Sequence, residues 1–397
     1  MAKMSDLSED LLMEILYRVP MTSLKTVRST CKKWNTLSKY NIFGKSVAKK
    51  QVLGFMIMDF KICSLRFNLQ GIRNNDGDFI DSSIKQISHL ETVRVYHCDG
   101  LLLCVTMDQP SSLVVWNPYL GQTRWILPRN NLHRYTRYAL GYGVDNKNKN
   151  HQHKILRFSN ECMNPGSYVS ASEIYDFSSD AWRVLDVSPE GDVQFHTNDV
   201  SLKGNTYFFA QEKDSPDGGE IQVFLLCFDF TRERFGSRLA VPFRICDEEN
   251  VILSCVGEDQ VAVLHQSLDL IKTMEIWVTT KIEPNAVSWS KFLKVDRTAL
   301  IGLSFEVDVG SFFIDEEKKI AVVFDIGRLK QTGTSRYQVA YIVGEDGYFK
   351  SVSLHLGLHE KLYNGYAYCH PFVCSSYVPS LVQVEINQLG KRKDRDY

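Results

Sequence analysis

The sequence has no long hydrophobic run. Its longest apolar stretch, Val52 to Met58, is far shorter than the roughly 20 residues that a helix needs to span a bilayer. The N-terminal residues Met1 to Asp6 become charged at once, without the apolar segment and cleavage site of a signal peptide. We therefore expect a soluble intracellular protein, located in the cytoplasm, the nucleus or both.

The sequence also lacks an excess of charge of either sign. Lys plus Arg number 46 and Asp plus Glu 47, so the formal net charge is -1. A nearly neutral chain has no global field that attracts nucleic acid or anionic lipid, and we predict neither as a partner. The charge is nevertheless uneven, because residues 1–50 hold ten basic and four acidic side chains, and the remainder holds 36 and 43.

Motifs of catalysis and of metal or cofactor binding are missing as well. The ten cysteines are scattered without a CxxC pair, which in a reducing compartment is typical of small buried hydrophobic residues. The chain has no P-loop, no dinucleotide fingerprint and no nucleophile elbow. We predict no catalytic residue, no metal, no cofactor and no disulfide.

Three groups of metal-ligating residue types fail on their spacing. His151 and His153 have no acidic or thiol ligand at a recognisable distance, so we interpret them as part of a solvated hairpin loop. The other two groups lack the glutamate of a zinc helix or the spacing of a zinc motif. They are His355 with His359, and Cys369 with His370 and Cys374.

The N-terminal segment has the pattern of a small helical module. Asp6 and Glu9 resemble a capping box, and apolar residues then recur on one helix face up to Val19. Pro20 ends that helix, and Thr22 can cap a second helical segment that runs to Trp34. A module of about 35 residues cannot cover its own apolar face, so we expect another surface to cover it.

The order of residues in this module strongly resembles an F-box. The resemblance is carried by Leu7, Asp10, Leu11, Ile15, Leu16, Arg18, Val19, Pro20, Leu24, Val27, Cys31, Lys32 and Trp34, while Ser8 and Thr30 depart from the family pattern. It implies docking onto the Skp-type adaptor of a cullin-based ubiquitin ligase. The implied adaptor-binding residues are Leu7, Leu11, Leu12, Ile15, Leu16, Val19, Pro20, Leu24, Val27, Cys31 and Trp34. The alternative is a helical cap that packs on the rest of the same chain.

Beyond residue 50 the sequence is mainly β, and one unit recurs. A strand ends in an aromatic residue, a polar turn follows, and a second strand begins. The first aromatic residues of these units are Phe67, Trp116, Tyr175, Phe228, Trp277 and Tyr341. Their intervals of 49, 59, 53, 49 and 64 residues favour a β-propeller of about six blades, with aromatics buried between blades and residues 371–386 closing the ring. The alternative is a pair of β-sandwiches.

This region is similar to the type 1 F-box-associated domain, a kelch-like family of plants. The similar segments are His97 to Leu102, Trp116 to Pro118, Leu140 to Gly143, Glu173 to Tyr175, Leu202 to Tyr207 and Glu275 to Trp277. The resemblance implies a propeller-like domain that binds a target protein. We expect a helical module at residues 1–46, a β domain at 50–387 and a charged flexible tail at 388–397.

These patterns predict a non-catalytic substrate receptor of an SCF-type ligase, in which the module holds the adaptor and the β domain binds a target protein. One alternative is a lectin-like receptor that stacks exposed aromatics on glycans. Another is a propeller hydrolase, which needs carboxylates gathered at one mouth of the ring.

One stretch stands out as a candidate target-binding surface. Residues 129–138 are basic and aromatic inside an acidic domain, and Arg and Tyr often anchor protein interfaces. We predict that an acidic or phosphorylated target segment contacts Arg129, His133, Arg134, Tyr135 and Arg137. The alternative is an exposed connector whose charges keep it solvated.

Overall fold

A computed structural model gives the fold of the protein. It describes residues 8, 11–12, 15, 27, 29–30, 32–40, 52–58, 60–69, 81–107, 112–128, 136–145, 150–159, 170–191, 193–212, 222–245, 250–267, 273–296, 309–329, 336–354, 373–374 and 377–384. None of the helices described there is long and apolar enough to cross a membrane.

The described part of the N-terminal module is helical. Leu11, Leu12 and Ile15 are in helical conformation, and so are Val27, Ser29 and Thr30. Helix α3 follows, spanning Lys32–Tyr40, and it packs the buried Leu37 one turn after the half-buried Trp34. Helix α3 contains Trp34, the last residue of the predicted second helical segment, and continues to Tyr40.

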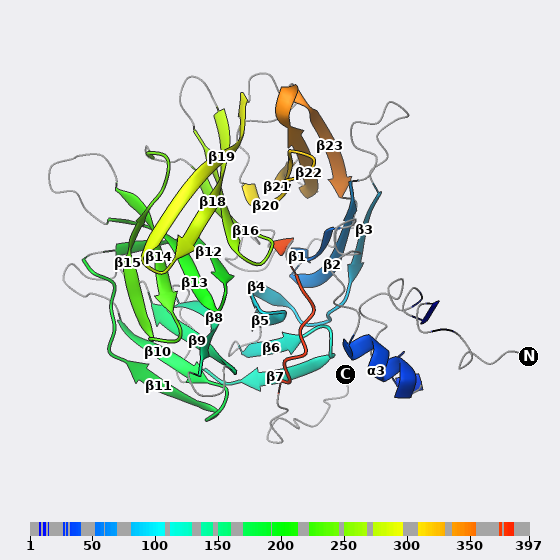
Figure 1. Ribbon diagram of the computed structural model, residues 1–397, viewed down its shortest axis with the longest axis vertical. Helices are drawn as coiled ribbons and strands as arrows, with labels where there is room; N and C mark the ends of the chain where they lie inside the picture. Colours follow the sequence, from blue (N-terminus) through cyan, green and yellow to red (C-terminus); the bar gives the residue numbers. More distant parts are fainter. Residues whose placement is uncertain are drawn as a thin grey trace, which may run out of the picture.

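The rest of the chain is built from four-stranded antiparallel sheets. The described strands form six of them, which lie as blades around a common axis (Figure 1). The first three blades in chain order, each led by its innermost strand, are β4 (Thr92–Cys98), β5 (Leu101–Thr106), β6 (Leu113–Asn117) and β7 (Gln122–Ile126); β8 (Thr136–Val144), β9 (His151–Ser159), β10 (Ser170–Asp176) and β11 (Ala181–Leu185); and β12 (Val193–Leu202), β13 (Asn205–Glu212), β14 (Val223–Asp229) and β15 (Arg234–Ala240).

The other three blades follow in the same pattern. The third of them contains strands from both ends of the domain. They are β16 (Asn250–Val256), β17 (Gln260–Gln266), β18 (Thr273–Glu283) and β19 (Ala286–Asp296); β20 (Val309–Asp315), β21 (Ile320–Leu329), β22 (Arg336–Gly344) and β23 (Phe349–Leu354), with a 3-10 turn η3 at Glu345–Gly347; and β24 (Val373–Cys374), β1 (Val52–Met58), β2 (Lys61–Asn68) and β3 (Asp81–Gln86).

The hydrophobic core is divided among the contacts between neighbouring blades. The described residues form six clusters of buried side chains, and each one joins residues of two adjacent blades. Phe313 and Leu65, for example, belong to one cluster although they come from the blades at opposite ends of the chain. The ring is thus closed by packing on all sides, and the prediction of a propeller with about six blades is confirmed.

The aromatic repeat marks one defined position in this architecture. All six first aromatics lie on the third strand of a blade, from Phe67 on β2 to Tyr341 on β22. Tyr175 and Phe228 are buried, as predicted, while Trp116, Trp277 and Tyr341 are half-buried. Trp125, the second aromatic of its unit, is 43% exposed on β7, so burial between blades was wrong for that residue.

The C-terminal segment closes the ring, as predicted. Strand β24 pairs with β1 through Phe55 opposite Cys374 and Met56 opposite Val373. Residues 377–384, called the strap below, then cross the blade β4–β7 (red trace in Figure 1). The Asn117 side-chain amide donates to the carbonyl oxygens of two strap residues, at 3.0 Å to Ser380 and 2.8 Å to Val382.

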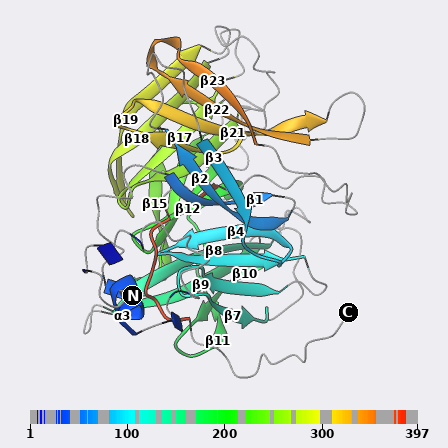
Figure 2. The ribbon, with the colours of Figure 1, turned by 90° about the vertical axis from the view of Figure 1, so that its right-hand side faces the viewer.

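The propeller has two different faces. The turns that join first to second and third to fourth strands lie on one face, called the turn face, and the links between second and third strands and between blades lie on the other, called the connection face. The strap lies on the turn face, and Figure 2 shows α3 on the same side. β1 is antiparallel to β24, so its first residue, Val52, also lies at the turn face.

Positive φ angles explain two of the sequence segments shared with the family. Asp99 and Gly100 join β4 to β5 with φ of 51° and 71°, and Lys203 and Gly204 join β12 to β13 with φ of 51° and 84°. Two successive residues with positive φ form the tight turn that suits the twist of a hairpin, and glycine adopts it without a steric cost. These turns hold two innermost strands against their neighbours.

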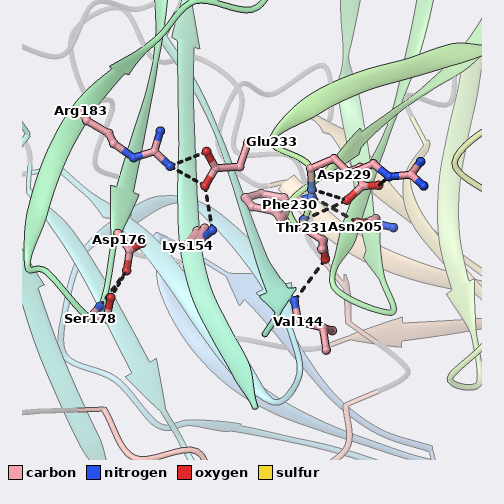
Figure 3. Close-up of polar contacts among 11 residues, drawn as sticks. Val144, Lys154, Asp176, Ser178, Arg183, Asn205, Asp229, Phe230, Thr231 and Glu233 are labelled. Atoms are coloured by element: carbon pink, nitrogen blue, oxygen red, sulfur yellow. Dashed lines mark hydrogen bonds and ion pairs between the residues drawn. The ribbon is translucent and has the colours of Figure 1, made fainter. Parts of the chain in front are cut away.

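A polar cluster ties the blade β8–β11 to the next blade (Figure 3). The Glu233 carboxylate lies in the β14–β15 turn and accepts hydrogen bonds from Lys154 of β9, at 2.7 Å, and from Arg183 of β11. Burial raises the pKa of Glu233, but these hydrogen bonds outweigh it and hold the pKa below its usual range. The carboxylate therefore stabilises the contact between blades in its ionised form.

Replacing this carboxylate should weaken the propeller at neutral pH. We expect Glu233→Gln to lower the free energy of unfolding by about 1–2 kcal/mol, because Lys154 loses a charged partner. A depressed pKa stabilises the fold above the unfolded value of about 4.3 and loses that contribution as pH falls through the folded value. Denaturant titration at pH 7 and below pH 4 gives the free energy of unfolding at both pH values. The difference between the two values should be smaller in the variant than in the unsubstituted chain. An equal loss at both pH values would contradict this, and Glu258→Gln, at an exposed turn, is the control.

Candidate functional site

A group of charged and polar side chains gathers where three innermost strands meet near the axis. It consists of Arg94 and Tyr96 on β4, Arg137 on β8, and His196 and Asp199 on β12, and is called the axis cluster below. Strand β12 lies against both β8 and β4, so these three strands are close neighbours at the axis. Arg94 and Arg137 stand near the strand ends that belong to the connection face.

Irregular strand pairing accompanies this cluster. In β4 the register shifts between Thr92 and Arg94, so one extra residue precedes the arginine. In β12 the register shifts between Phe195 and Asp199, which leaves His196 inside the irregular stretch. Bulges re-aim side chains and leave backbone groups free of the ladder, and they are common beside functional sites.

Arg137 uses the irregularity of β12 directly. Its guanidinium donates to the carbonyl oxygen of Phe195 at 2.8 Å and to that of His196. The His196 ring lies 2.8 Å from the side-chain oxygen of Gln211 through its Nε2 atom. Arg137 is thus held in place at the axis by backbone groups, with its positive charge uncompensated by those contacts.

The charges of the cluster are unevenly matched. Burial raises the pKa of Asp199 to about 7, and the nearby Arg137 and Arg94 only partly oppose this shift. Burial also raises the pKa of Tyr96, which Arg94 opposes from beside it. Burial lowers the pKa of His196. Near pH 7 the cluster therefore holds two guanidinium groups against one half-ionised carboxyl group.

A second polar group lies on the turn face. Asp99 accepts contacts from His151 Nδ1 at 3.2 Å and His153 Nε2 at 3.3 Å, and Tyr142 stacks on His151 with ring centroids 3.8 Å apart. The interpretation of both histidines as part of a solvated hairpin loop was wrong, because they belong to β9 and His153 is buried. Within the described ranges, no three His, Cys, Asp or Glu residues are arranged to hold a metal ion.

The described residues of the helical module divide into exposed and covered positions. Leu11 is 54% exposed, whereas its neighbour Leu12 is fully buried. Ile15, Val27 and Trp34 are half-buried. An apolar side chain on a helix that stays half exposed is available to a partner, and Leu11 fits this description best.

Comparison with known proteins decides the family. Residues 4–46 match the model of the F-box domain, and residues 53–384 match that of the F-box associated beta propeller domain. The chain belongs to the F-box proteins with an F-box associated β-propeller domain. An F-box/kelch-repeat protein of Arabidopsis thaliana is 53% identical over 99% of this chain and 100% of its own length.

Two more F-box relatives from the same plant cover nearly the whole chain. One, described as a putative F-box protein, is 54% identical and the other 53%, each over 97% of this chain and 100% of the relative. Among solved structures, the tricorn protease aligns with 79% of this chain and 32% of its own at a TM-score of 0.35 and 10% identity. That likeness is too low to bear on fold or function.

The two departures from the F-box pattern have visible local roles. The Ser8 hydroxyl accepts a hydrogen bond from the Leu11 N–H at 3.4 Å, and the Leu12 N–H donates to the Ser8 carbonyl at 3.0 Å. Ser8 therefore caps the helix that carries Leu11. Asp6 and Glu9, the predicted capping box, lie outside the described residues. The exposed Thr30 donates its hydroxyl to the Val27 carbonyl at 2.6 Å.

Most of the remaining predicted site residues lie outside the described residues. In the F-box these are Leu7, Leu16, Val19, Pro20, Leu24 and Cys31, and in the candidate target surface Arg129, His133, Arg134 and Tyr135. Arg137 is described, and it is half-buried with hydrogen bonds to β12. The assignment of these residues to binding stays a prediction.

Sequence reasoning missed the partners of Arg137. Arg94, Tyr96 and Asp199 are separated from it by 43, 41 and 62 residues and carry no shared motif. The sequence signal was present only as polar residues inside strongly β segments. Recognising it required knowing which strands are innermost.

Proposed function

We propose that the chain is a non-catalytic substrate receptor of an SCF-type ubiquitin ligase. The F-box holds a Skp-type adaptor, and the propeller presents a target protein to the other subunits, which carry out ubiquitin transfer. The observation that carries the proposal is the combination of an F-box match with a complete, strap-closed propeller in one chain. The contribution of such a receptor to the reaction is proximity.

The arrangement of the propeller favours the connection face as the target surface. The F-box precedes β1, which begins at the turn face, and the strap lies on that same face. Polar side chains of the turn face are also engaged internally, as with Asp99, Asp229 and Glu233. The connection face is the side of the links between blades, and the predicted stretch 129–135 is one of those links, between β7 and β8.

Glycan binding has less support. Stacking on sugars needs exposed aromatic side chains, and among the described residues Trp125 is the aromatic with a large exposed surface. One exposed ring on an outermost strand does not form a platform. We therefore place target recognition in protein contacts.

Proximity labelling in plant cells tests the proposal. The full chain and a chain without residues 1–45 are each fused to a labelling enzyme while proteasomal degradation is blocked. The full chain should label a Skp-type adaptor and a cullin, and the shortened chain should lose both while it keeps labelling its target candidates. Equal labelling of the adaptor by both chains would contradict the proposed role of the F-box.

A further inference from the structure

The axis cluster brings two guanidinium groups, those of Arg94 and Arg137, close to the single carboxyl group of Asp199. Arg94 is exposed, whereas Tyr96 beside it is buried. Arg137 is half-buried and fixed to two carbonyl groups of β12. Two guanidinium groups near one carboxyl group leave an excess of positive charge, which is costly at a half-buried place without an anion.

The backbone around the cluster also departs from regular strand structure. Both β4 and β12 depart from regular pairing at this level, directly before Arg94 and around His196. The two irregularities come from different blades and lie on innermost strands. Such a coincidence costs ladder hydrogen bonds in both strands, and a binding role explains why the fold retains it.

We propose that the axis cluster binds an acidic side chain of the target peptide, with Arg94 as the residue that contacts its carboxylate. The proposal rests on the proposed function, since it names the chemistry of the target. Arg94 is the more exposed of the two arginines, and a guanidinium binds a carboxylate through two parallel hydrogen bonds. Arg137 adds a fixed positive charge, and its position is set by β12.

A short acidic peptide fits better than a nucleic acid. Outside residues 1–50 the chain carries 36 basic and 43 acidic residues, so the propeller as a whole repels a long polyanion. A single acidic side chain experiences the local field of the two arginines instead. The connection face, where Arg94 and Arg137 lie closest to the surface, is also the proposed target surface.

Asp199 makes the affinity depend on pH. Because its pKa is raised to about 7, Asp199 is largely neutral at pH 6.5 and ionised at pH 8. The other groups that face it are Arg94 and Tyr96 of β4 and Arg137 of β8. Burial raises the pKa of Tyr96, so its hydroxyl stays neutral over this range. His196 on the same strand has a lowered pKa and stays mainly neutral. An acidic ligand should therefore bind more tightly at pH 6.5.

The test uses the full chain with its Skp-type adaptor and two fluorescent eight-residue peptides. One has two central glutamates between glycine and serine residues, and the other has glutamines in their place. We expect the glutamate peptide to bind in an anisotropy titration and the glutamine peptide to bind about tenfold more weakly. Arg94→Gln should remove that difference, Arg94→Lys should restore part of it, and Arg234→Gln, at an exposed residue of β15, should leave it unchanged.

The outcomes separate this proposal from the proposed function. Equal binding of both peptides overturns the acidic-peptide site. An Arg94→Gln variant that keeps the difference in affinity between the two peptides overturns it as well. Displacement of the glutamate peptide by a 12-nucleotide oligothymidine is the third outcome that overturns it. Tighter binding at pH 6.5 than at pH 8 that disappears in Asp199→Asn supports it. Adaptor binding is measured in the same samples. A wild-type chain that does not bind the adaptor contradicts the role of the F-box, whatever the result with the peptides.

Discussion

A chain that ends at residue 372 should fail to form a stable propeller. It lacks β24, so β1 loses its inner partner and the blade β1–β3 becomes an open edge. It also lacks the strap, which buries Tyr377 and Val384 and accepts two hydrogen bonds from Asn117. Burial of two large side chains and these hydrogen bonds amount to about 5 kcal/mol or more, which is comparable to the whole stability of many domains.

Thermal unfolding followed by circular dichroism measures this effect. The shortened chain should lose the cooperative transition of the full chain or aggregate through its open edge. A chain that ends at residue 387 keeps the strap, and it should unfold like the full chain. Asn117→Ala should give a smaller loss, since it removes the amide donor to the strap but leaves β24 paired. A cooperative and unshifted transition in the chain that ends at 372 would show that the ring closes without its C-terminal strand.

Leu11→Asp should abolish binding of a Skp-type adaptor. Leu11 is 54% exposed on a helix capped by Ser8, whereas Leu12 is buried. Docking of Leu11 removes its apolar surface from water, which is worth about 1.5–3 kcal/mol, and an aspartate at the interface adds the cost of burying a charge. We expect the dissociation constant to rise by about 100-fold or more.

Isothermal titration calorimetry of the purified chain with the adaptor checks this effect. Leu11→Ala should weaken binding less than Leu11→Asp, because it removes apolar contact without introducing a charge. Leu127→Asp is the matched control, since Leu127 is 73% exposed but lies at the end of β7 in the propeller. Wild-type affinity in Leu11→Asp, or an equal loss in Leu127→Asp, would exclude this helix face as the docking surface.

The fold was predictable because its repeat is local. The aromatic residue on the third strand recurs at intervals set by the length of a blade, and it needs no knowledge of distant contacts. The segments Cys98 to Leu102 and Leu202 to Tyr207 are also local, since each encodes a tight hairpin turn. Ring closure by residues 371–386 was also expected from the sequence, and the pairing of β24 with β1 confirms it.

The axis cluster was not predictable from the sequence. Its members lie close together near the propeller axis, but they share no local sequence pattern. Arg137 was predicted to be a target-binding residue because it belongs to the basic and aromatic stretch 129–138. In the structure its guanidinium donates to the carbonyl oxygens of Phe195 and His196, where the pairing of β12 with β13 becomes irregular. The histidines of β9 were misjudged for a related reason, because their partner Asp99 belongs to the preceding blade.

We propose that the F-box and the propeller of this chain join an adaptor to a bound target. The molar mass of a mixture of the full chain and a purified Skp-type adaptor, measured by light scattering during size exclusion, tests the first requirement of this proposal most directly. We expect one species with the mass of one adaptor plus the 45.5 kDa chain. Separate elution of the two folded proteins would contradict it.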